Sequence, residues 1–425
     1  MNIKIKINSG RIITLLFLLC DTRFFYLLHL FKGFGGVASN KALLGIYCII
    51  LFTVSLVFKR HLLHSVFTID LIAFVAIATL STAIAHHKIG FTLSDSIFYM
   101  YTYFVLLSYF PLSKVLLKRT HDELFVQDAL IVWDVTCILF IIQYILFKKN
   151  GTIFLQLDSM IGARYLYNRS LGLRVYGVFD GFIKIFLPLL AHKCIIQNFK
   201  SCKRYLFSIF IMLTSIILID QSRFYIIAIL ITIMIDFILV NHRRIRLTNL
   251  VIGSVLFIGA LFILYGKMSS IYLSIQNNTG SLYARTGAIE YYMSIFQSHK
   301  FWGIGVVNPS PVSPFYNFVH GSTGIYFTDD VGIVGFLVRF GLVGIIWLSC
   351  FLVHIIKIVI KTHGTDKYLS ISLVTMFIIC MFAQSYFDPG RVVALLFLCL
   401  ALEVNYIRNE KIHCESNQKK QISKI

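Results

Sequence analysis

Arginine side chains stand out in the polar intervals of an otherwise apolar chain. Four of them lie in the intervals 148–174 and 266–330, namely Arg164, Arg169, Arg174 and Arg285. A guanidinium can bind phosphate or carboxylate through two parallel hydrogen bonds, whereas a lysine ammonium acts as a point charge. These residues therefore predict binding of an anionic ligand. The three arginines in 148–174 have tyrosine and leucine neighbours. An alternative role for these three is contact with anionic lipid headgroups at the membrane interface.

Two short turns each combine an aspartate with an arginine. The turn "IDQSRFY" places Asp220 three residues before Arg223, and the turn "FDPGR" places Asp388 three residues before Arg391. Each arginine is predicted to face an anionic ligand in a cavity beside the turn. The alternatives are a helix cap with a local ion pair in the first turn, and simple chain reversal by Pro and Gly in the second.

The interval 266–330 also holds candidates for acid–base chemistry and for a close approach of backbone segments. Histidine is the residue type that most often serves as a general base near neutral pH, so His320 is a candidate for that role, the alternative being a solvated loop histidine. Asp329 and Asp330 precede an apolar helix, where they either meet a ligand or stabilise the positive end of the helix dipole. The segment "FWGIG" predicts a turn that approaches another backbone segment closely. The segment "YARTGAIEYYMSIF" has helical spacing and is expected to lie along the membrane surface.

The elements that position these residues are predicted to be membrane-spanning helices. Of 425 residues, 58% are hydrophobic and only 14% are charged, whereas soluble domains carry charge on about 25% of their residues. The apolar residues form runs of roughly 20, the length that crosses a bilayer as a helix. The sequence therefore predicts an all-α polytopic membrane protein, with residues 1–425 forming one integral membrane domain in contact with the lipid bilayer.

About twelve spans are expected, with the large external loop 266–330 before the tenth. Their approximate ranges are 12–31, 42–58, 66–85, 96–117, 128–147, 175–196, 205–220, 223–240, 247–265, 331–356, 368–387 and 391–407. Asp21 and Arg23 interrupt the first run, which can therefore divide into two pieces. The interval 148–174 is the first long external loop.

Charge distribution predicts the topology. Basic clusters occupy alternate loops and both ends of the chain, so the positive-inside rule places both termini in the cytoplasm. The same rule accounts for most of the net charge of +20, and nucleic acid is not expected as a partner. The tail, 408–425, is basic and is expected to lack regular structure.

Metal and cofactor chemistry is not expected. The nine cysteines contain no CxxC pair, and most lie in apolar runs, as small buried hydrophobic residues do. The chain has no GxxxxGK[ST] phosphate loop, no HExxH zinc helix and no GxSxG elbow. His86 and His87 are adjacent, so their rings diverge on a helix and make a poor metal site.

Three segments in this order resemble the Wzy-type polymerases of bacterial surface polysaccharide, within the O-antigen ligase and polymerase superfamily. They are "DQSRFYIIAIL", "ARTGAIEYYMSIFQSHKFWGIG" and "DDVGIVGFLVRFGLVGI". The resemblance covers roughly the C-terminal half of the chain. It implies a glycosyltransferase in the bacterial inner membrane that transfers a growing glycan from undecaprenyl pyrophosphate to another lipid-linked repeat unit, at the outer face.

The resemblance also implies roles for particular residues. External-loop arginines of the family are thought to hold the pyrophosphate without a metal, and Arg223 and Arg285 match them best, ahead of Arg164, Arg169 and Arg174. Arg223, Arg285 and His320 are the catalytic candidates, and Asp330 and Arg391 join the other three arginines as candidates for substrate binding. A chain-length regulator is a further partner of the family, and O-antigen (lipopolysaccharide) or capsule is its product.

The sequence departs from the family in two ways, and two alternative functions stay open. Some polymerases carry an arginine, ten further residues and then a glycine, and none of the five family-matched arginines fits that spacing. Ligases favour a His–Asn pair, whereas His320 is followed by Gly321. The first alternative is an O-antigen ligase. The second is a flippase for the lipid-linked repeat unit. Charged residues within the predicted spans, namely Lys184, Asp236 and Arg339, favour this alternative.

Overall fold

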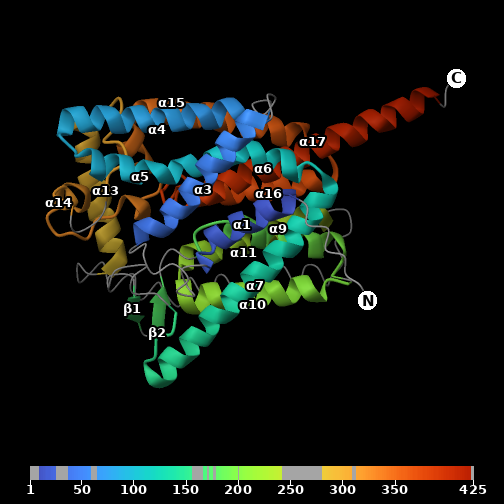
Figure 1. The fold of residues 1–425 in the computed structure, drawn as a ribbon, viewed down its shortest axis with the longest axis horizontal. Helices are drawn as coiled ribbons and strands as arrows, with labels where there is room; N and C mark the ends of the chain where they lie inside the picture. Colours follow the sequence, from blue (N-terminus) through green and yellow to red (C-terminus); the bar gives the residue numbers. More distant parts are fainter. Residues whose placement is uncertain are drawn as a thin grey trace.

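The computed structural model (Figure 1) is almost entirely helical. The residues that it describes are 9–24, 37–58, 65–155, 166–169, 172–175, 179–199, 201–241, 280–308 and 313–422. The helices of more than three residues are α1 (Ser9–Asp21), α3 (Val37–Phe58), α4 (Thr68–Ile89), α5 (Leu93–Phe104), η1 (Val105–Ser108), α6 (Tyr109–Leu116), α7 (Arg119–Asn150), α9 (Ile183–Ile196), α10 (Lys203–Ser215), η2 (Ile216–Asp220), α11 (Arg223–Asn241), α13 (Gly280–Ser298), α14 (Tyr316–His320), α15 (Ile333–Lys361), α16 (Gly364–Met381) and α17 (Val392–Ile422).

Six helices in the described part of the chain are long and apolar enough to cross a membrane. They are Thr68–Ile89, Asp122–Asn150, Phe224–Asn241, Ile333–Lys361, Gly364–Met381 and Val392–Glu410. This supports the expected helical membrane protein, but the count does not reach the expected twelve.

The difference arises because several apolar runs form short or divided helices. Helix α9 has 14 residues, fewer than the roughly 20 that a span needs, and α10 changes after 13 residues to the π-helical segment η2. The run 96–117 divides into α5, the 3₁₀ segment η1 and α6. The expected span 247–265 lies outside the described residues.

The interruption predicted in the first apolar run is confirmed. Helix α1 ends at Asp21, and Arg23 has a left-handed φ of 57°. The Asp21 carboxylate accepts a hydrogen bond from the Phe182 backbone N–H at 3.1 Å. Asp21 thus ends α1 beside the start of α9.

The two ends of the bundle differ in what they carry. Figure 1 shows α13, α14 and the hairpin of β1 (Leu166–Arg169) and β2 (Gly172–Val175) at one end, which we call the loop end. Helix α1 begins near the opposite end, the tail end, where α17 projects beyond the bundle. The tail was expected to lack regular structure, but α17 continues to Ile422, because Glu, Lys and Gln in this stretch favour helix.

Aromatic side chains join α4, α15 and the turn after α16 into one core. The Phe74 ring lies 4.6 Å from that of Trp347, 5.3 Å from that of Phe340 and 5.2 Å from that of Phe387. Phe387 immediately precedes Asp388. This packing fixes the turn that carries the ionic groups described next.

Candidate functional site

The turn between α16 and α17 presents Arg391 to several protein groups. Its Nη1 lies 2.5 Å from Asp388 Oδ2 and donates to the Asp329 carbonyl oxygen at 2.9 Å, and its Nε lies 3.4 Å from Asp180 Oδ1. The residue is 2% exposed. The turn therefore does more than reverse the chain: it ties the start of α17 to two distant segments.

Arg339, on the first half of α15, shares the same aspartate. Its Nη1 lies 2.6 Å from Asp388 Oδ1, and its Nη2 donates to Thr328 Oγ1 at 2.5 Å and to the Asp329 carboxylate. Asp329 and Thr328 belong to the short 3₁₀ helix η3 (Thr328–Asp330). Asp329 therefore pairs with a buried arginine, while in the described structure the start of α15 at Gly332 has no side-chain cap.

Lys184 on α9 completes the group. Its Nζ lies 2.7 Å from Asp180 Oδ1 and 4.6 Å from the centre of the Tyr225 ring on α11. Three carboxylates and three cations thus meet where five segments converge. We call them the ion cluster: Asp180, Lys184, Asp329, Arg339, Asp388 and Arg391.

Asp388 is the most deeply buried carboxylate of the ion cluster. Its side chain is 1% exposed. Burial, and then the negative charge of Asp329, raises the pKa of Asp388 to about 7, against the lowering effect of Arg339 and Arg391. A buried carboxylate this close to its titration point couples the charge of the cluster to pH.

Helix α15 is broken beside the ion cluster, and a loop fills the break. At Gly341 the backbone has φ 63° and ψ −159°. The freed Val338 and Arg339 carbonyls accept hydrogen bonds from the N–H groups of Ile304 and Gly305, each at 2.9 Å. Leu342 N–H in turn donates to the Lys300 carbonyl at 2.8 Å. Backbone groups that the break exposes are thus satisfied within the protein.

Glycine is required at this crossing. Gly303 and Gly341 have φ values of +68° and +63°, and a Cβ on either would overlap a carbonyl oxygen of the opposite segment. The close backbone approach predicted for "FWGIG" is confirmed. The crossing fixes Arg339 in position, because its own carbonyl is one of the acceptors.

His320 is buried in the loop that precedes η3. It is 1% exposed, and its Nδ1 lies 2.6 Å from the Tyr326 carbonyl oxygen. Because a carbonyl only accepts, Nδ1–H is the donor of this hydrogen bond. The Tyr326 N–H also donates to the His320 carbonyl at 3.1 Å. His320 is therefore not solvated, and it closes the loop 320–326.

Arg285 lies on α13, which crosses the loop end beside this loop. The spacing of Arg285, Ala288 and Tyr292 puts the three on one helix face, and Ala288 and Tyr292 are buried. The Tyr292 hydroxyl donates to the Val319 carbonyl at 2.7 Å. Arg285 is half-buried, and its buried Nε has no hydrogen-bond partner among the described residues. The Nε–H of this guanidinium thus makes no hydrogen bond within the described structure.

The other predicted site residues are placed only in part. Asp330 ends η3 and is half-buried. Arg223 begins α11, while Arg169 and Arg174 lie in the β1–β2 hairpin, where they pair with Gly172 and Tyr167. The side chains of these three arginines, and Arg164 altogether, lie outside the described residues.

Sequence reasoning missed the ion cluster as a unit. Lys184 and Arg339 stood out as charges in apolar runs, but Asp180 did not, and no pairing followed. The available signal was that a charge within an apolar run needs an opposite charge nearby. In the described part of the chain, no three His, Cys, Asp or Glu side chains group to hold a metal ion.

The fold and the ion cluster define a helical membrane protein with a buried ionic site at one end of its bundle. The chain matches no protein-family model and no curated protein. What it does is therefore argued from the site.

Proposed function

We propose that this chain polymerises lipid-linked oligosaccharide repeat units. The donor is a glycan on undecaprenyl pyrophosphate, and the acceptor is the nonreducing end of another lipid-linked repeat unit. The loop end faces outward from the bacterial inner membrane, both termini are cytoplasmic, and the short helices complete about twelve passes. The product is a surface polysaccharide, and a chain-length regulator is a candidate partner.

One observation carries the proposal: Arg285 has a buried Nε with no partner in the described part of the chain, and its helix, α13, contacts η3 and α15, which carry part of the ion cluster. A guanidinium with a free Nε–H can hold a pyrophosphate through two hydrogen bonds. Its positive charge would stabilise the charge that develops on the pyrophosphate as the glycosyl bond breaks. Arg223 is a second candidate for the same role.

The ion cluster is proposed to hold the segments around the site in position. Arg391 and Arg339 already bond to protein groups, and they hold the segment 328–330 against the start of α17. Asp330 lies at the end of that segment. His320 closes the neighbouring loop 320–326, so its proposed contribution is to keep that loop in place beside the site. Arg164, Arg169 and Arg174 are proposed to bind the second lipid-linked substrate.

A second function, transport of the lipid-linked repeat unit, has its own support. Interrupted helices and buried intramembrane charges are features of transporters. Here α15 is interrupted at Gly341, and His192 on α9 pairs with Asp236 on α11 at 2.8 Å, both buried.

Deleting the gene in its host and displaying the extracted surface glycan on a gel separates the functions. A polymerase predicts loss of the ladder and accumulation of single repeat units, with no rescue by Arg285→Ala. Rescue by Lys357→Ala serves as the control, because Lys357 is exposed near the end of α15.

Two other outcomes would replace the proposal. Long polymer that stays on its lipid carrier would indicate an O-antigen ligase. Repeat units trapped on the cytoplasmic face would indicate the transporter. Full rescue by Arg285→Ala would remove Arg285 from the site whichever function holds.

A further inference from the structure

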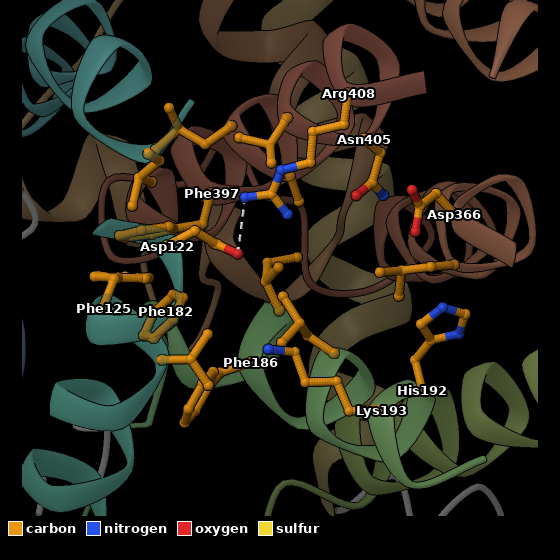
Figure 2. Close-up of a pocket in the computed structure, with 18 of the residues that line it drawn as sticks. Asp122, Phe125, Phe182, Phe186, His192, Lys193, Asp366, Phe397, Asn405 and Arg408 are labelled. Atoms are coloured by element: carbon orange, nitrogen blue, oxygen red, sulfur yellow. Dashed lines mark ion pairs between the residues drawn. The ribbon is translucent and has the colours of Figure 1, made fainter. Parts of the chain in front are cut away.

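A narrow cavity lies inside the bundle, away from α13 and α14. Its volume is about 210 Å³, and α9 and α17 form most of its wall (Figure 2). Along α9 the lining residues recur at helical spacing, from Phe182 through Leu189 to Ile196. That stretch is about 20 Å long. A small volume lined over such a length suits an extended chain better than a compact ligand.

The wall is aromatic at one end of this cavity. The Phe182 ring lies 4.2 Å from the Phe397 ring, and Phe397 stacks at 5.8 Å on Phe125. Phe182, Phe186 and Phe397 are each at most 3% exposed. This end is dry and accepts hydrocarbon.

The opposite end is polar and carries two cations, Lys193 and Arg408, beside two carboxylates, Asp122 and Asp366. Lys193, in the last turn of α9, and Arg408, on α17, point into the same cavity (Figure 2). Arg408 Nη2 lies 2.9 Å from Asp122 Oδ2, with side chains 30% and 21% exposed, which marks the open end. The Nε of Arg408 is nevertheless buried, and no described residue offers it a hydrogen bond.

His192 gives an independent indication of a ligand. It lines the cavity and is 3% exposed, its Nδ1 pairs with Asp236 at 2.8 Å, and its Nε2 has no partner within the described structure. A buried ring nitrogen without a partner is costly unless a ligand meets it. With Nδ1 occupied by Asp236, Nε2 is the ring nitrogen that is left for a polar group of the occupant.

The carboxylates of the cavity bond to groups other than Lys193. Asp122 pairs with Arg408, and Asp366 accepts a hydrogen bond from Asn409 Nδ2 at 3.0 Å. No hydrogen bond or ion pair joins Lys193 to another described side chain, and Asp122 and Glu123 act on it through their charge alone. The Nζ–H groups of Lys193 are therefore left for the occupant.

We propose that this cavity binds an anionic phospholipid, with the phosphate at Lys193, Arg408 and His192 and one acyl chain between α9 and α17. The phospholipid is a structural ligand at the tail end of the bundle. The inference does not depend on the glycosyltransferase activity, and its readout is lipid retention.

Native mass spectrometry of the full chain, purified in detergent and incubated with phosphatidylglycerol, tests the proposal. Lys193→Met is expected to weaken retention about tenfold or more, since it removes a charged hydrogen bond. Lys357→Met, a change of an exposed lysine, is expected to leave retention unchanged. Phosphatidylcholine, which has no net charge, should be retained less.

A second variant guards against loss of fold in the first. Leu189→Trp fills the cavity and keeps every charge, so it is expected to abolish retention while Lys193 stays in place. Equal retention in the native chain and either cavity variant would overturn the proposal, as would equal retention of phosphatidylcholine. Displacement of the lipid by inorganic phosphate alone would show a free-phosphate site instead.

Discussion

Arg339 and Asp388 are 49 residues apart in sequence, yet their side chains meet at 2.6 Å inside the bundle. Asp388 also holds Arg391 at 2.5 Å, so one carboxylate joins two arginines from two helices. Through Arg339 and Arg391 the same carboxylate fixes η3, the segment that leads into α15. The position of η3 at the candidate site thus depends on a single buried aspartate.

Replacing Asp388 by alanine should therefore destabilise the protein strongly. The change removes the two oxygens that accept hydrogen bonds from the buried Arg339 and Arg391 guanidiniums, which costs about 3 kcal/mol. Thermal unfolding in detergent measures the change. Glu290→Ala, on the exposed side of α13, is the matched truncation of a carboxylate and should leave the midpoint unchanged. Equal midpoints for both variants would contradict the account.

The pKa of Asp388 predicts how stability depends on pH. The native pKa of about 7 lies above the ordinary value of 3.8, so between these values the folded state binds the proton that the unfolded state releases. The contribution of Asp388 to stability is then greatest at low pH and declines as pH rises toward about 7. Unfolding midpoints measured from pH 5 to 8 should fall less steeply for Asp388→Asn than for the native chain. Parallel slopes would show that Asp388 does not titrate in this range.

The break in α15 should be intolerant of any side chain at Gly341. Gly341→Ala imposes a left-handed backbone on alanine and a clash with the Phe301 carbonyl, for a combined cost of about 3 kcal/mol or more. Gly151→Ala is the control, because Gly151 has a similar φ of +68° and no described atom within 4 Å of an added Cβ. Because ψ is 7° at Gly151 and −159° at Gly341, this control measures the cost of a left-handed residue without a clash, about 1 kcal/mol, and Gly341→Ala should cost more. Similar unfolding midpoints for the two variants would argue against the crossing.

The sequence predicted local features well and long-range pairing poorly. The interruption at Asp21 and the close approach at "FWGIG" follow from residue type alone, since a charge disfavours an apolar helix and glycine permits positive φ. The cluster around Asp388 needed three segments to be brought together, which no spacing rule encodes. Six described helices reach membrane-spanning length where twelve spans were expected, because apolar composition does not reveal where a helix ends or changes to 3₁₀ geometry, as it does at η1.

The candidate site could be predicted only in its outline. Arg391 and His320 were marked by residue type, yet the structure shows both engaged with protein groups. Whether a polar side chain faces a ligand or the protein depends on packing, which the sequence does not show. Arg285 stays a proposed pyrophosphate ligand because its Nε lacks a partner among the described residues, a fact that only the structure supplies.

The most direct test uses purified protein with a repeat unit on undecaprenyl pyrophosphate, comparing the native chain, Arg285→Ala and Lys357→Ala. The account predicts that Arg285→Ala forms no polymer, while its free energy of unfolding stays within about 0.5 kcal/mol of the native value, because no described hydrogen bond is lost. Lys357→Ala should polymerise normally. Polymer of native length from Arg285→Ala would contradict the account, and no polymer from the native chain would reject the polymerase itself.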